Sequence, residues 1–128
     1  MVGVMRPAVM ALAAVLLVVG CPKKAEDEWS RAFGGVGLDY ACSAEQTSDG
    51  GYIIAGRTDS YDAVLDDILL IETDADGEKV WEKTFGDEGL DWAESVLQIS
   101  DGGYSAAGVT TSYGAGGYDV WLVKTPEP

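Results

Sequence analysis

The chain has 128 residues, with 22 acidic and 8 basic side chains, no histidine and a formal net charge of −14. This length allows one ordinary domain at most, and the negative charge argues against nucleic acid as a partner because its phosphates would be repelled. Without histidine, the chain lacks the commonest general base and transition-metal ligand, which disfavours serine hydrolysis and histidine-ligated metal centres.

Residues 1–20 have the pattern of a signal peptide. Arg6 supplies an early positive charge, and twelve apolar residues follow from Ala8 to Val19. This run is shorter than the roughly 20 residues that span a bilayer, but it has the length of a signal-peptide apolar region. We expect a helical signal segment, with an uncleaved anchor as the alternative.

The motif Val18-Val19-Gly20-Cys21 ends this apolar run. It resembles the lipobox of bacterial lipoproteins, in which a small or aliphatic tripeptide precedes an obligatory cysteine. The resemblance implies cleavage before Cys21, acylation of that residue, and a protein held by lipid in the bacterial envelope, on its periplasmic or cell-surface side. Because each buried methylene contributes about 0.8 kcal/mol, several acyl chains give a durable attachment.

Residues 21–28 then comprise the lipidated cysteine and a polar tether, since the stretch PKKAEDE has no apolar periodicity. Lipidation of Cys21 leaves Cys42 without a partner within the chain, so we expect no disulfide.

The remaining sequence is a tandem repeat. Residues 29–76 align without a gap to residues 81–128, at an offset of 52, and 23 of the 48 positions are identical. The phrase SDGGY occurs in both copies. A fixed period near 50 residues is typical of a structural unit that is used repeatedly.

Each copy contains short apolar runs between turn-forming residues, without the 3.6-residue periodicity of a helix. We predict strands at residues 67–73, 79–85, 93–99 and 104–110, joined in part by tight turns at Asp74–Gly77 and Ser100–Gly103. Together they would form one four-stranded antiparallel meander, which is the content of a propeller blade.

The other blade takes strands from both ends of the repeat region, with EWSRAF beside DVWLVKT. We therefore expect residues 29–125 to form an all-β domain of two four-stranded, antiparallel, propeller-blade-like repeats of 52 residues. In this interpretation the N- and C-terminal strands are paired, as in the closure of complete propellers.

The stretches DDILLIETDADGEKVWEKTFG and WEKTFGDEGLDWAESVLQISDGGYSAAGVTTS resemble the repeats of a family of secreted and lipid-anchored bacterial β-propeller proteins. The resemblance covers residues 28–125 and departs from the family pattern at Glu72, Asp87 and Pro126. It implies a propeller-type fold and carries no particular chemistry.

Two blades are too few to enclose a channel, because common propellers have four to eight. Three architectures remain open. Three copies of the chain would give six blades around one axis, two blades could close face to face as a small sandwich, or the chain could be a fragment of a longer propeller.

One turn suggests a metal. Asp74 and Asp76, followed by Glu78, resemble the aspartate-rich loops that bind calcium, although Phe85 stands where such a loop carries its twelfth-position ligand. The alternative is a plain hairpin turn, which is also the role that we expect for Asp49 and Asp101 beside their glycine pairs.

No other motif indicates catalysis, and we expect no catalytic residues and no cofactor apart from calcium at Asp74 and Asp76. The sequence favours a non-catalytic binding or scaffold module whose partners are the membrane, through lipid, and a protein, a glycan or further copies of itself. The alternatives are a carboxylate-dependent glycan hydrolase, which needs two acids at a set separation, and a truncated propeller without activity.

Overall fold

The computed structural model describes residues 28–126, so the predicted signal segment and Cys21 lie outside the described residues. The described chain is all-β and contains no helix long and apolar enough to cross a membrane. Its strands are β1 (Asp39–Gln46), β2 (Tyr52–Thr58), β3 (Asp67–Thr73), β4 (Lys79–Phe85), β5 (Asp91–Gln98), β6 (Tyr104–Thr110) and β7 (Asp119–Thr125).

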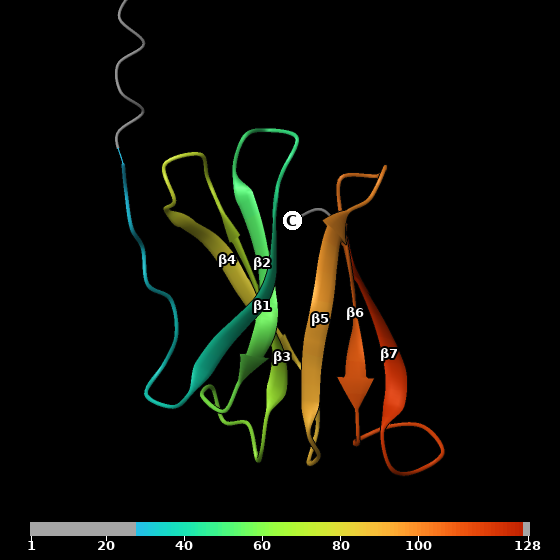
Figure 1. Ribbon diagram of the computed structural model, residues 1–128. Coiled ribbons are helices and arrows are strands. Elements are labelled where there is room, and N and C mark those ends of the chain that lie inside the picture. Colours follow the sequence, from blue (N-terminus) through green and yellow to red (C-terminus); the bar gives the residue numbers. More distant parts are fainter. Residues whose placement is uncertain (1–27, 127–128) are drawn as a thin grey trace, which may run out of the picture.

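The strands form two antiparallel sheets that lie side by side (Figure 1). The first sheet has the order β1-β2-β3-β4 and the second the order β5-β6-β7. The all-β prediction and the antiparallel connections are therefore confirmed. Of the four strand ranges predicted from the turns, those of β3, β4 and β6 coincide with the structure, and that of β5 begins two residues earlier.

The predicted division into blades is wrong at one junction. We expected β4 and β5 to pair in one meander, but they belong to different sheets. Residues 86–90 carry the chain from one sheet to the next. They are bonded to the segment that directly follows β6, because the amides of Gly89 and Leu90 donate to Ser112 Oγ and Thr111 Oγ1 at 3.0 and 2.6 Å. A glycine-rich connection that looks like a hairpin in sequence is thus a crossing between sheets.

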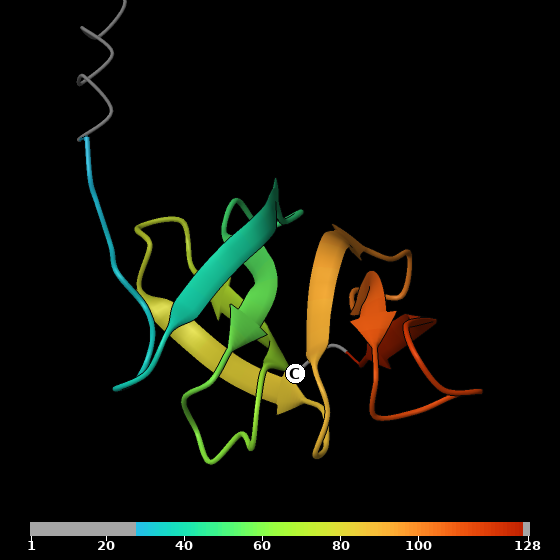
Figure 2. The same cartoon turned by 60° about the horizontal axis from the view of Figure 1, so that its bottom comes forward.

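The predicted pairing of the first and last strands is also wrong within one chain. Residues 28–38 form no strand, and in the described part of the chain β6 is the only strand that pairs with β7. The N-terminal segment instead lies along the first sheet, on the side away from β7 in both views (Figures 1 and 2). The next section shows which contacts hold it there.

The core lies between the two sheets. The face of the first sheet that looks toward the second, here called its inner face, contributes Ile53, Ala55, Ile68 and Leu70. The inner face of the second sheet contributes Ala93, Val96, Tyr104, Ala106 and Val123, and Trp81, Phe85 and Trp121 pack against this cluster. Because side chains alternate along a strand, every second residue of β2 and β6 points instead to an outer face.

Candidate functional site

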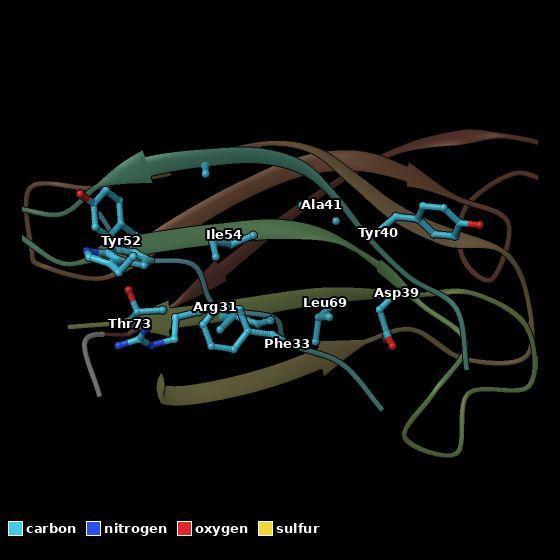
Figure 3. A pocket seen from close by; sticks show the side chains of 13 residues that line it. Arg31, Phe33, Asp39, Tyr40, Ala41, Tyr52, Ile54, Leu69 and Thr73 are labelled. Carbon is cyan, nitrogen blue, oxygen red and sulfur yellow. The ribbon is translucent and has the colours of Figure 1, made fainter. Parts of the chain in front are cut away.

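The outer face of the first sheet carries a cavity of about 400 Å³ (Figure 3). Its floor includes Ile54 of β2 together with Leu69 and Ile71 of β3. Trp29 and Phe33 of the N-terminal segment line it as well. The site is therefore an apolar hollow between the sheet and the segment that precedes β1.

The sequence of β3 explains why this face is apolar. Its residues DILLIET form a continuous apolar run, which is typical of a strand that is covered on both faces. Ile68 and Leu70 point toward the second sheet, whereas Leu69 and Ile71 point outward, yet these two are only 5% and 3% exposed. The apolar outer face of β3 therefore requires a layer of protein over it, and the N-terminal segment provides part of that layer.

Trp29 anchors that segment to the first sheet. Its ring stands edge-on to Tyr52, with 5.7 Å between ring centroids, and it passes over Gly77 at the turn between β3 and β4. Arg31 reinforces the contact, because its Nη2 atom lies 2.9 Å from Glu78 Oε1. Trp29 remains 41% exposed, so the cover over the hollow is incomplete.

The sequence repeat shows which surface of the second sheet is equivalent to the hollow, and that surface is buried. Shifting the three floor residues by 52 positions gives Ala106, Trp121 and Val123, and all three belong to the contact between the sheets. The aromatic contact is repeated too, because Trp81 lies on Tyr104 with 5.9 Å between centroids. The hollow of the first sheet is therefore equivalent to the surface of the second sheet on which the first sheet packs.

The recurring aspartates at the starts of β1 and β5 hold the loops around them. Asp39 Oδ2 accepts hydrogen bonds from Gly35 N at 3.0 Å and from Ser60 Oγ at 3.2 Å. Asp91 Oδ2 accepts from Asp87 N at 3.3 Å and from Ser112 Oγ at 2.5 Å. These bonds give both carboxylates a structural role in holding the loops beside their strands.

A pair of acidic groups between the sheets was missed from the sequence. Asp67 and Asp91 lie on either side of Gly86, where an added Cβ would overlap Asp67 Oδ1 and come 3.0 Å from Asp91 Oδ2. Within residues 28–126, the Oδ1 atoms of both aspartates are buried without a hydrogen-bond partner. Burial, followed by the negative charge of Asp91, raises the pKa of Asp67.

Asp74 and Asp76, the predicted calcium ligands, lie in the turn between β3 and β4. Asp74 Oδ1 accepts hydrogen bonds from Asp76 N and Glu78 N, both at 2.9 Å, as in the Asx turns that aspartate commonly makes. No group of three or more acidic, cysteine or histidine side chains is placed to hold a metal in the described part of the chain. The calcium site stays a prediction.

Two further expectations concern the hairpins and the second cysteine. Asp49 and Asp101 cap the β1–β2 and β5–β6 turns, accepting from Gly51 N and Gly103 N at 3.1 and 3.0 Å, as expected. Cys42 is exposed and forms no disulfide with any residue that the structure describes. Desolvation, followed by the charge of Glu94, raises the pKa of its thiol, which lowers the reactive thiolate fraction.

Comparison of the sequence with protein-family models and with curated proteins gave no match. The hollow and its equivalence to the buried face of the second sheet are therefore the features from which a function must be argued.

Proposed function

We propose that the protein is a lipid-anchored, non-catalytic scaffold module of the bacterial cell envelope, which binds the surface of another protein through the outer face of its first sheet. We further propose that its two sheets are blades of a propeller-type architecture. The Val18-Val19-Gly20-Cys21 motif supports the lipid anchor. The acidic residues Asp39 and Asp91 accept bonds from their own loops, which supports a structural rather than a hydrolytic use of these carboxylates.

One observation carries the binding proposal. The equivalent surface of the second sheet binds a β-sheet, because Ala106 and Val123 are buried beneath the first sheet. The hollow has the corresponding apolar floor and the same aromatic pair at one end. A floor of aliphatic side chains suits the apolar side chains of a protein better than a polar sugar.

Lipid attachment is tested by substitution of each cysteine in the full chain. Cys21→Ser should abolish incorporation of a palmitate analogue and release the protein from the membrane fraction. The matched control Cys42→Ser should retain both properties, since Cys42 lies on an exposed strand. Lipid incorporation that persists in Cys21→Ser would refute this assignment.

Binding at the hollow is tested with a photo-reactive benzophenone amino acid in place of Ala44, an exposed residue that lines the cavity. The control places it at Glu45, the next residue, whose side chain points to the other face of β1. In intact cells, the Ala44 position should yield a protein adduct of defined mass, identified by its peptides, which is absent with the probe at Glu45. Equal labelling, or no adduct, would refute the proposal.

A further inference from the structure

The outer edge and outer face of the second sheet are open. On β7, Val120 and Leu122 are 89% and 68% exposed, whereas their counterparts on β3, Ile68 and Leu70, are fully buried. Two neighbours cause the difference. The side chains on β3 pack against the second sheet, and β3 is paired with β4 along its edge. Within residues 28–126, β7 has neither neighbour.

The repeat specifies a strand that fits this edge. By the 52-residue offset, residues 29–33 correspond to residues 81–85 of β4. On β3, Phe85 lies opposite Ile68 and Lys83 opposite Leu70. The same register on β7 would place Phe33 opposite Val120 and Arg31 opposite Leu122.

Residues 34–38, which connect residues 29–33 to β1, show where the strand formed by residues 29–33 must lie relative to the first sheet. Residues 34–38 and 86–90 make matching hydrogen bonds. Gly37 N donates to Ser60 Oγ at 2.9 Å and Gly89 N to Ser112 Oγ at 3.0 Å. Residues 86–90 lead from the edge strand of one sheet into the following sheet, so residues 34–38 should do the same.

Residues 29–33 therefore belong to the edge of a sheet that precedes the first sheet. That sheet would lie on the outer face of the first sheet, over the hollow, whereas the second sheet of the same chain lies on the inner face. The segment is already in place, because Trp29 contacts Tyr52 as Trp81 contacts Tyr104.

We infer that the partner of the hollow is a second copy of this chain, bound head to tail. The second sheet of one copy covers the hollow of the next, and residues 29–33 of that next copy pair with β7 of the first as its fourth strand. This inference rests on the proposed binding role of the hollow and names its occupant. With two sheets in each copy, rings of two to four copies would contain four to eight blades, the number usual in propellers.

A cyclic arrangement is compatible with the anchor. Rotation about one axis leaves the start of every copy on the same side of the ring, so all lipid-bearing ends face one membrane. In this register Lys124, which forms an ion pair with Asp101 at 2.9 Å, would lie opposite Trp29, whose indole ring can also attract a cation.

The register is tested by disulfide trapping in the full-length lipidated protein carrying Cys42→Ser. Arg31→Cys and Leu122→Cys together should give, under mild oxidation, a ladder of covalent multimers that ends at the ring size. A mixture of the two single variants should give heterodimers that contain both chains. Ser30→Cys with Leu122→Cys is the matched control, because residue 30 lies one position out of register and should crosslink at least tenfold less.

A disulfide formed only within single chains, or equal trapping in the Ser30→Cys control, would overturn the inference. Failure of this inference and failure of the proposed function are distinguishable. A different protein crosslinked at Ala44, without trapping between residues 31 and 122, refutes the self-assembly and keeps the binding role. The absence of both products refutes both.

Discussion

The indole of Trp29 packs edge-on against Tyr52 with 5.7 Å between ring centroids, although Trp29 belongs to no strand. The corresponding contact of Trp81 with Tyr104, in which the rings are tilted by 50°, packs against the core. The two Trp–Tyr pairs have the same sequence spacing but differ in how far the rest of the chain covers them. Substitution of Trp29 should therefore affect mainly the docking of the N-terminal segment, whereas substitution of Trp81 should affect mainly the stability of the fold.

We predict that Trp29→Ala lowers the free energy of unfolding by only about 1 kcal/mol, the scale of an exposed aromatic pair. The same substitution should abolish the proposed head-to-tail association. Trp81→Ala should cost about 3 kcal/mol because it removes a ring that packs on the core. Urea unfolding and the mass of the detergent-solubilised protein measure the two effects. Equal costs for the two substitutions would contradict this assignment.

We predict that the Trp29 ring can pack against the turn between β3 and β4 only if residue 77 is glycine. Its φ is +78°, and an added Cβ would lie 2.5 Å from the Trp29 ring. Gly117 is a matched control, since its φ is +75° and a Cβ there would meet nothing within 4 Å. Both Ala variants are destabilised by the left-handed backbone conformation that alanine must adopt. Gly77→Ala should be less stable by about a further 1 kcal/mol, the scale of the aromatic contact that it would displace. It should also expose Trp29 to a fluorescence quencher. Equal stabilities of Gly77→Ala and Gly117→Ala would show that packing of the Trp29 ring does not depend on glycine at position 77.

The pair Asp67 and Asp91 predicts a dependence of stability on pH. The pKa of Asp67 is raised in the folded protein, so the folded state holds that proton more tightly than the unfolded state. The resulting stability is present at acid pH, below the ordinary aspartate pKa, and is lost as pH rises through the raised pKa.

Asp67→Asn should therefore flatten the fall in the urea midpoint as the pH rises above the ordinary aspartate pKa, because an amide carries no charge beside Asp91. Asp76→Asn changes the net charge equally on an exposed turn and serves as the control. An unaltered slope in Asp67→Asn would show that another group produces the pH dependence.

The turn between β3 and β4 provides a test of the metal hypothesis. Asp74→Ala should lower the free energy of unfolding by about 1–2 kcal/mol, the scale of the net contribution of two hydrogen bonds, since it removes the carboxylate that accepts from the amides of Asp76 and Glu78. Asp76→Ala should cost less than about 0.5 kcal/mol, as is usual for surface substitutions. A melting temperature that rises at millimolar calcium in the parent protein, but not in either variant, would establish a cation site. An unchanged melting temperature would contradict it.

The strands and hairpins were predictable because their signals are local. Apolar runs such as DILLIET, and glycines such as Gly102 with its φ of +87°, mark strands and turns within a few residues. The crossing at residues 86–90 was not predictable in this way. It is decided by bonds to Ser112 and Thr111, more than twenty residues away, and its composition resembles that of the true hairpins.

The candidate site was predictable only in part. The 52-residue offset pairs Trp29 with Trp81, but no local pattern shows that one indole packs against the core and the other beside an open hollow. The charge environment of Asp67 was missed for a related reason. Its neighbour Asp91 approaches from the other sheet, and the closeness of the two carboxylates depends on how the sheets pack.

The matching connections at residues 34–38 and 86–90 give the molecule a polarity. In the head-to-tail assembly that we propose, each unit has one receiving end and one donating end, so every addition to a growing chain of units recreates the same pair of ends. Only a rotation that returns to its starting point terminates such growth; any other angle yields an open filament with a bare strand that templates further addition. Confinement of the proposed lipid tails to one bilayer would select against the helical rise of a filament, so the anchor that we propose would itself favour closure.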